Sequence, residues 1–277
     1  MNWVPPSDTL QFRDGMWQPR TISDVSYPEG GNDVCFQVED SSYWFNHRNS
    51  CILDVIQLFP PQGMIYDIGG GNGFVAAALQ EAGFEVSLVE PGCGALNAKK
   101  RGVRNVIHAA LQDTGFQPGS LHATCAFDVV EHVEDDREFV RSIRNLLKPG
   151  GRLYLSVPAS QALWSDQDVY AGHFRRYSRK SLARLLGDAD LEIEFISGFF
   201  TWLVLPLYLL RALPYRLRGS HTKTLGSLKI TQETHTLPRL IESPIGKIHR
   251  WERTRLRRNR PMSLGSSLIC CARTAQR

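Results

Sequence analysis

The stretch Ile65-Tyr-Asp-Ile-Gly-Gly-Gly-Asn-Gly73 decides how this sequence folds. The apolar residues 64–68 predict a buried strand, and the pattern of residues 74–82 predicts a helix directly after the glycines. Glycines suit this connection because the backbone must turn sharply and approach a ligand closely, and Cβ atoms would obstruct both. The stretch therefore predicts a strand–loop–helix unit that binds a ligand at its loop.

The regions outside this unit repeat the alternation of strand and helix. Further strands are expected at 84–89, 105–108, 123–129, 152–157, 191–195 and 267–272, and further helices at 46–59, 95–100, 135–147 and 181–186. Strands that alternate with helices form a parallel sheet with helices on both faces. We therefore expect an α/β fold with a Rossmann-like, doubly wound, mostly parallel sheet.

The 277 residues suit one α/β domain with insertions. We expect an N-terminal arm or lid at 1–45, a ligand-binding core at 46–198, an apolar and basic helical insertion at 199–262, and a final strand at 263–277. No basic start followed by an apolar run opens the sequence, so no signal peptide is expected. The six cysteines form no CxxC pair, which favours a reduced cytoplasmic protein without structural zinc.

The net charge of +4 is unevenly distributed along the chain. Residues 211–277 hold 15 Lys and Arg against three Glu, so the remainder of the chain is acidic. Such a basic segment can meet nucleic acid, anionic lipid or an acidic substrate, or it can cover the acidic remainder. A basic helical face beside an acidic body is the commoner arrangement, so no nucleic-acid partner is expected.

Two cofactors compete for the glycine loop. Glu90 ends the second strand, where a carboxylate can accept both hydroxyls of a ribose. The spacing Gly71-x-Gly73-x-x-Ala76 satisfies the dinucleotide pattern, which keeps an NAD(P)-dependent oxidoreductase open. The acidic residue in Asp67-x-Gly69-x-Gly71-x-Gly73 is instead typical of enzymes that use S-adenosylmethionine (SAM).

Several motifs in order resemble the class I SAM-dependent methyltransferases, in particular the small-molecule branch that includes the ubiquinone-biosynthesis O-methyltransferases. The matching segments are 67–73, Glu90, 127–133, 147–151, the Tyr43-Trp-Phe-x-x-Arg48 segment and the 163–177 segment. The likeness covers about residues 43–195, and residues 265–272 are similar to the last, antiparallel strand of the family. The resemblance implies an antiparallel last strand, an N-terminal arm and a C-terminal helical insertion around the sheet.

The resemblance also implies roles for individual residues. The cofactor-binding set it implies is Trp44, Arg48, Asp67, Gly69, Gly71, Gly73, Glu90, Leu111 and Phe127. The glycines would frame the methionine part of SAM, Glu90 would hold the ribose, and Leu111 would flank the adenine. One departure is the missing acidic residue directly after the third strand, so Gln112, Asp113 or the backbone would bind the adenine amino group.

Candidate catalytic residues follow the fourth and fifth strands, because ligands in such sheets bind beyond the carboxyl ends of the strands. His132 suits a general base at neutral pH, and His173 and Tyr177 would close over the same site. A purely structural role is open for each of them. A metal site built from Glu131, His132 and Asp168 is conceivable, but the spacing matches no dedicated ligand set, so none is expected.

These observations predict transfer of a methyl group from SAM to an O, N or C atom of a small or lipophilic metabolite. A non-catalytic SAM-binding protein remains a second hypothesis. The apolar stretch 199–213 is shorter than the ~20 residues of a spanning helix and contains Pro206. It could be a buried helix, a lid over the acceptor, or an anchor through 199–218 at a membrane surface. We expect a cytoplasmic protein with peripheral membrane contact left open, and the oligomeric state does not follow from the sequence.

Overall fold

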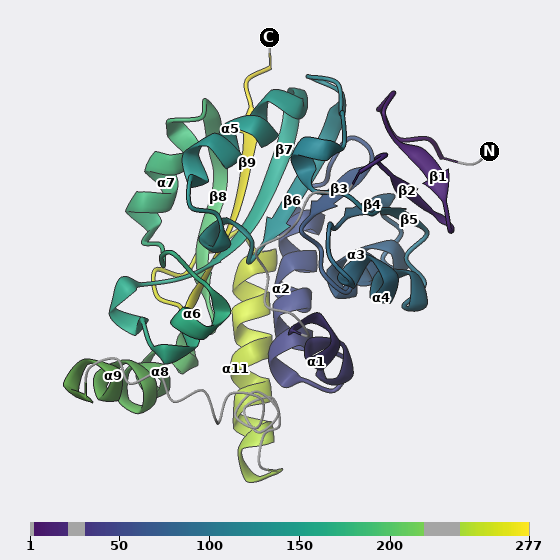
Figure 1. Cartoon of the computed structure of the whole chain (residues 1–277). Helices are drawn as coiled ribbons and strands as arrows, with labels where there is room; N and C mark the ends of the chain where they lie inside the picture. Colours follow the sequence, from purple (N-terminus) through teal and green to yellow (C-terminus); the bar gives the residue numbers. More distant parts are fainter. Residues whose placement is uncertain (1–2, 22–30, 219–238, 277) are drawn as a thin grey trace.

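The computed structural model describes residues 3–21, 31–218 and 239–276. Nine strands form one sheet in the order β1-β2-β5-β4-β3-β6-β7-β9-β8 (Figure 1). The strands are β1 Gln11–Arg13, β2 Met16–Gln18, β3 Ile65–Ile68, β4 Val86–Val89, β5 Asn105–Ile107, β6 Leu121–Phe127, β7 Leu147–Pro158, β8 Leu191–Phe199 and β9 Ser267–Thr274. The larger helices are α1 Gly31–Val38, α2 Tyr43–Leu58, α3 Phe74–Glu81, α4 Gly94–Lys100, α5 Asp136–Leu146, α6 Asp166–Ala171, α7 Arg179–Gly187 and α11 Arg239–Arg257.

The pairing confirms the predicted fold class. Strands β5, β4, β3, β6 and β7 are parallel, and β9 lies antiparallel between β7 and β8. The chain leaves β3 toward β4 on one side and returns to β6 on the other. In open α/β sheets a crevice forms at such a reversal, beyond the carboxyl ends of the strands.

Helices cover both faces of the sheet and give the fold two apolar cores. One core joins the sheet to α2, α3, α4 and α11, and the other joins it to α5 and α7. The helix expected at 46–59 begins earlier, at Tyr43, because Ser42 caps it by accepting hydrogen bonds from the amides of Trp44 and Phe45. The first helical turn therefore carries Trp44 toward the carboxyl edge of the sheet.

The N-terminal arm contains more regular structure than its sequence indicates. Strands β1 and β2 form a hairpin around Asp14 and Gly15, both at positive φ, and β2 pairs with β5 through Trp17 and Ile107. Strands of three residues leave no detectable period in the sequence, so tertiary pairing alone reveals them.

Residues 219–238 of the expected 199–262 insertion lie outside the described part of the chain, and the rest of the insertion is divided between buried and exposed parts. Phe199 and Phe200 are fully buried, but Phe199 ends strand β8 and Phe200 follows it, so the buried part of the apolar stretch is not the helix considered from the sequence. The following helices α8 Val204–Leu207 and α9 Leu213–Arg218, joined by the π-helical turn η5 Tyr208–Ala212, lie at one end of the molecule (Figure 1). Leu205 is 64% exposed and Leu210 is 76% exposed, so this part of the stretch is not core.

The basic C-terminal helix packs along α2 (Figure 1). Asp54 on α2 is fully buried and accepts hydrogen bonds from Arg253 at 2.8 Å and from Arg257 at 2.7 Å. Arg253 and Arg257 neutralise this buried carboxylate. The contact is of the kind expected if the basic C-terminal segment covers the acidic remainder of the chain.

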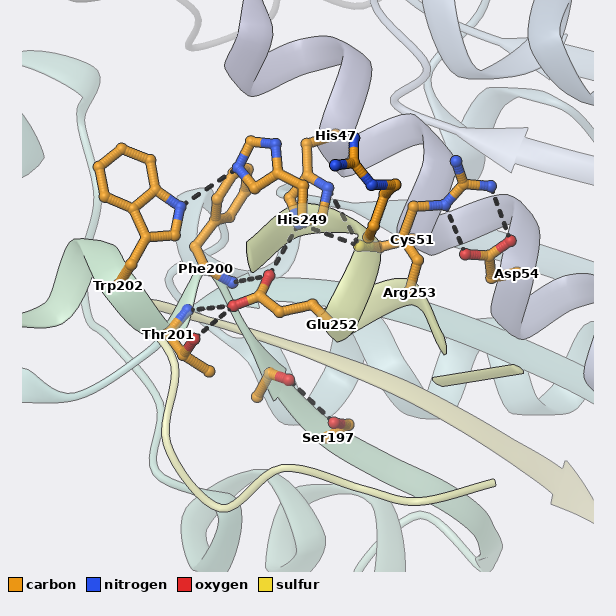
Figure 2. A network of polar contacts seen from close by, with 12 residues as sticks. His47, Cys51, Asp54, Ser197, Phe200, Thr201, Trp202, His249, Glu252 and Arg253 are labelled. Atoms are coloured by element: carbon orange, nitrogen blue, oxygen red, sulfur yellow. Dashed lines mark hydrogen bonds and ion pairs between the residues drawn. The ribbon is translucent and has the colours of Figure 1, made fainter. Parts of the chain in front are cut away.

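A buried polar network holds α2, α11 and the segment after β8 together (Figure 2). Glu252 on α11 is fully buried, lies 2.7 Å from His47 Nε2 and accepts hydrogen bonds from the amides of Phe200 and Thr201. Burial opposes ionisation, but the hydrogen bonds from His47 and Thr201 outweigh it and lower the pKa of Glu252. His249 stacks on His47 at 3.6 Å and accepts a hydrogen bond from Trp202 Nε1.

The lowered pKa of His249 makes the free energy of unfolding depend on pH. Burial and the adjacent His47 lower the pKa of His249 from 6.5 to about 4. The unfolded chain therefore binds one more proton than the folded chain between about pH 6.5 and 4, so stability is lost as pH falls through this window. His249→Gln keeps an acceptor for Trp202 but cannot titrate, and it should flatten the pH dependence of unfolding by up to about one proton per molecule. Urea unfolding measured from pH 7.5 to 4.5 tests this, and parallel curves for the two proteins would contradict it.

Candidate active site

A cavity of about 560 Å³ lies at the carboxyl ends of β3, β4 and β6, the expected place for a ligand in this topology. Most of the residues predicted to bind the cofactor line it. Those residues are Trp44, Arg48, Asp67, Gly69, Gly71, Glu90, Leu111 and Phe127. Gln112 also lines the cavity after β5, whereas Asp113 does not.

The glycine loop follows β3 and holds Gly69, Gly71 and Gly73 at φ angles of 67°, 54° and 73°. L-residues with side chains are strained in this left-handed region, which explains the glycines. A Cβ on Gly69 would lie 2.8 Å from Val129, and one on Gly73 would lie 2.7 Å from Ala98 on α4. Gly73 therefore permits close packing of α3 on α4 and does not face the cavity.

Glu90 and Asp67 place two carboxyl groups at the floor of the cavity. Glu90 ends β4, is 8% exposed, and accepts hydrogen bonds from the amides of Gly71 at 2.9 Å and Gly92 at 2.8 Å. Burial raises its pKa despite these hydrogen bonds. Asp67 is buried beneath the loop, and burial together with Glu90 raises its pKa to about 7, against the opposing effect of Arg48. Within the described residues Asp67 Oδ2 has no hydrogen-bond partner.

Helix α2 contributes an aromatic and a cationic side chain to the cavity. Arg48 forms an ion pair with Asp128 and donates to the carbonyl of Phe127 at 3.0 Å, so it fastens α2 to the end of β6. Trp44 stacks on Phe200 with ring centres 5.5 Å apart, and the guanidinium of Arg48 lies over the Trp44 ring. Both side chains face the cavity, but the guanidinium of Arg48 is already committed to the protein.

Two of the predicted catalytic residues meet at the cavity. The rings of His132, in the turn after β6, and His173, after α6, lie 4.7 Å apart. His173 Nδ1 lies 2.9 Å from Asp168, which also accepts a hydrogen bond from Arg176 at 2.7 Å. Burial and His173 lower the pKa of His132 to about 4, so its ring is neutral at physiological pH.

The third predicted catalytic residue, Tyr177, lies elsewhere. Its side chain is 3% exposed, and its hydroxyl donates to Asp136 at 2.7 Å, at the start of α5. Burial and Asp136 raise its pKa further from neutrality. Tyr177 lines neither of the cavities described here, because its backbone pairs with Ala159 and its ring packs into the core under α5 and α7. The prediction that Tyr177 closes over the site is therefore wrong, and its contacts are those of a structural residue.

Some cavity residues carried no recognisable signal in the sequence. Glu39 comes from the N-terminal arm, accepts a hydrogen bond from Asn72 of the glycine loop and pairs with Arg101 at 2.7 Å. The arm has no sustained pattern, so its contribution could not be assigned in advance. Asn72, inside the glycine loop, is the residue to which Glu39 is hydrogen-bonded.

A second cavity of about 310 Å³ adjoins the first. The two cavities share Trp44, Asp128, His132 and His173 among their lining residues. Apolar side chains of the second cavity include Tyr43, Leu203 and Leu207, and its cationic side chains are Arg176 and Arg211. A molecule in the second cavity would meet one in the first beside the two histidines.

Glu131, His132 and His173 bring three potential ligand atoms within 4.8 Å of one another. This set differs from the Glu131, His132 and Asp168 set considered on sequence, because Asp168 is bonded to His173 and Arg176 instead. Burial and Asp128 raise the pKa of Glu131 well above its usual range, and a carboxyl group must lose its proton to bind a metal. The expectation that no metal binds stays a prediction.

Comparisons with known proteins agree with this geometry. A family model described as a methyltransferase domain matches residues 44–194. A ubiquinone biosynthesis O-methyltransferase from Xanthomonas campestris pv. campestris (strain B100) is 27% identical over 158 residues, which is 50% of this chain and 66% of the relative. The corresponding protein from Xanthomonas oryzae pv. oryzae (strain PXO99A) is 27% identical over 154 residues, or 48% and 64% of the two chains. The chain therefore matches slightly less than two thirds of the length of these relatives.

Two solved structures share the fold. Phosphoethanolamine N-methyltransferase 2 from Haemonchus contortus, solved with SAM, has a TM-score of 0.54 at 15% identity and covers 94% of this chain and 62% of its own. A SAM-dependent methyltransferase from Archaeoglobus fulgidus has a TM-score of 0.53 at 15% identity, with coverage of 82% and 93%. At these identities the likeness concerns the arrangement of strands and helices.

Proposed function

The chain belongs to the methyltransferase domain family, and on this basis we propose that it transfers a methyl group from SAM to an O, N or C atom of a small or lipophilic acceptor. One observation carries the proposal: a cavity lined by the glycine loop and Glu90 adjoins a second cavity, and the two share His132. Two adjoining cavities suit a reaction that brings a methyl donor and an acceptor together.

The residues of the first cavity fit SAM better than a dinucleotide. The Glu90 carboxylate suits the two hydroxyls of a ribose, and Leu111 offers an apolar contact beside it. The buried, unpartnered Oδ2 of Asp67 lies beneath the loop among the described residues, where it would favour a cation. A cationic ammonium or sulfonium group of SAM would favour the ionised form of Asp67, whereas the pyrophosphate of NAD would raise its pKa further. This charge distribution argues against the oxidoreductase hypothesis.

Bound SAM would supply an electrophilic methyl group, which an in-line displacement moves to the acceptor and leaves S-adenosylhomocysteine. The protein must orient the acceptor and, for many acceptors, remove a proton. His132 lies where the two cavities meet and is neutral at physiological pH, so it can accept that proton or a hydrogen bond. The hydrogen bond between Asp168 and His173 fixes the orientation of the His173 ring, which contacts the ring of His132.

Binding and turnover test the proposal separately. Calorimetry should show micromolar affinity for SAM and for S-adenosylhomocysteine and far weaker binding of NAD. Tight NAD binding without SAM binding would overturn the methyltransferase proposal. A metabolite screen with methyl-labelled SAM should then transfer label to an acceptor, whereas SAM binding with no transfer to any metabolite would favour the non-catalytic SAM-binding hypothesis.

We also propose that the insertion docks on an anionic membrane surface. No helix in the described part of the chain is long and apolar enough to cross a membrane. Leu209, Leu210 and Leu217 are 48%, 76% and 77% exposed, and Arg216, which is also exposed, precedes Leu217 in the chain. Apolar side chains interspersed with arginine suit the boundary between lipid headgroups and acyl chains.

Liposome sedimentation tests this docking. At low salt the protein should pellet with vesicles that contain phosphatidylserine and remain in the supernatant with neutral vesicles. Leu210→Asp combined with Leu217→Asp should reduce pelleting about tenfold or more, because charge replaces apolar area at the lipid surface. Leu96→Asp is the matched control, since Leu96 is 49% exposed on α4. If the unmodified protein stays in the supernatant, the lid interpretation of this segment is favoured instead.

A further inference from the structure

The second cavity contains an imbalance of charge. Arg211 lines it from the π-helical turn η5, and the guanidinium donates to Gln167 of α6. Among the described residues Arg211 forms no ion pair. A half-buried guanidinium that is hydrogen-bonded to a neutral amide keeps a positive charge that an anionic ligand can pair with.

Neighbouring groups do not balance this charge. The pKa of Arg211 is lowered, chiefly by burial and also by Arg176, while Tyr43 and Asp168 oppose the shift. Three carboxyl groups lie near the two arginines, but each is otherwise occupied. Asp168 is bonded to Arg176 and to His173, Asp128 is paired with Arg48, and burial raises the pKa of Glu131 well above its usual range. None of these carboxyl groups is bonded to Arg211, so its positive charge is left for a ligand in the cavity.

The backbone around Arg211 also differs from an ordinary helix. Residues 208–212 form a π-helical turn between α8 and α9, and such turns are rare and frequently lie at functional sites. The wider turn sets Arg211 toward Gln167 and the cavity, while Leu209 and Leu210 of the same turn point to solvent. One turn thus separates a cationic inner face from an apolar outer face.

We propose that Arg211 binds an anionic group, a carboxylate or a phosphate, on the methyl acceptor. This inference rests on the proposed methyltransferase function and names the substrate class of the same site. A guanidinium recognises either anion through paired N–H donors, and Ser266, Ser267 and Gln167 supply neutral polar groups around it. Tyr43, Leu203 and Leu207 supply the apolar walls for the body of the acceptor. The acceptor is therefore an amphiphilic acid, with its methylated atom toward His132 and its anion toward Arg211.

The size of the cavity restricts that acceptor. About 310 Å³ is at the lower end of small-molecule sites, enough for a single ring with its substituents. A longer apolar tail would have to leave the cavity along the insertion. Benzoate and phenyl phosphate are therefore suitable probes of the two anionic groups, and benzamide is the uncharged probe of the same shape as benzoate.

The experiment measures probe binding to protein saturated with S-adenosylhomocysteine, by ligand-observed NMR. Benzoate or phenyl phosphate should bind at least tenfold more tightly than benzamide, and whichever anion binds more tightly identifies the group on the acceptor. Arg211→Gln should abolish this preference, and Arg216→Gln, a change of an exposed arginine outside both cavities, should preserve it.

For the unmodified protein, two outcomes overturn the inference: binding of benzamide equal to that of the better anion, or no binding of either anion. An unchanged preference in Arg211→Gln overturns it as well. The affinity for S-adenosylhomocysteine, measured in the same samples, should be equal in all three proteins. If the unmodified protein fails to bind S-adenosylhomocysteine, the proposed function fails, and that failure is distinguishable from loss of the anion preference alone.

Discussion

Replacement of Glu90 by alanine should weaken SAM binding by about 10²–10⁴-fold. The carboxylate would accept hydrogen bonds from two ribose hydroxyls, and a hydrogen bond to a charged group contributes about 1.5–3 kcal/mol. Because about 1.4 kcal/mol corresponds to a tenfold change in affinity, loss of both bonds gives this range. Calorimetry with SAM and S-adenosylhomocysteine measures the effect.

The structure supplies the controls for this change. Glu85 precedes the same strand β4 and is exposed, so Glu85→Ala removes one negative charge nearby without touching the cavity. Its affinity for SAM should remain within about threefold of the original. Glu90→Gln retains one acceptor and should fall between the two variants. If Glu90→Ala binds SAM as tightly as the unmodified protein, Glu90 does not hold the ribose.

Removal of the His132 imidazole should lower turnover by about 10²–10⁴-fold, the usual contribution of a general base. His132→Ala leaves the glycine loop and Glu90 in place, so affinity for S-adenosylhomocysteine should be nearly unchanged. His122→Ala is the control, because His122 lies at the opposite end of β6 and contacts Lys148. An acceptor found in the metabolite screen serves for the rate measurement.

The pH dependence of turnover separates a base from a structural histidine. A base acts in its neutral form, and burial with His173 lowers the pKa of His132 to about 4. The rate should therefore stay level as pH falls through 6.5 and decline only toward pH 4, a different result from that of an unperturbed histidine. A structural His132 would instead leave turnover per folded molecule unchanged in His132→Ala while lowering its melting temperature. Full turnover in the variant would contradict the assignment.

Local patterns were sufficient to predict most of the residues that line the first cavity. Asp67 lies in strand β3, the glycines at 69 and 71 follow that strand, and Glu90 follows β4. This order is enough to predict that they meet at one edge of the sheet. Gly73 belongs to the same motif, yet it packs against Ala98 of α4 and does not line the cavity. The spacing of a motif does not specify which of its residues a neighbouring helix contacts. Tyr177 failed for a similar reason: it follows β7 in the chain, but its hydroxyl is bonded to Asp136 on α5.

The sequence by itself determined the α/β class, because short-range periodicity encodes it, and its ordered motifs resemble the methyltransferase family, whose domain model matches the chain. Only the tertiary structure decided what lies opposite the glycine loop. The pairing of α11 with α2 depends on Glu252 reaching His47, 205 residues away, and on Asp54 reaching Arg253. The second cavity depends on Arg211 reaching Gln167 across 44 residues. Such contacts depend on the packing of whole elements, and no local window of sequence contains both partners.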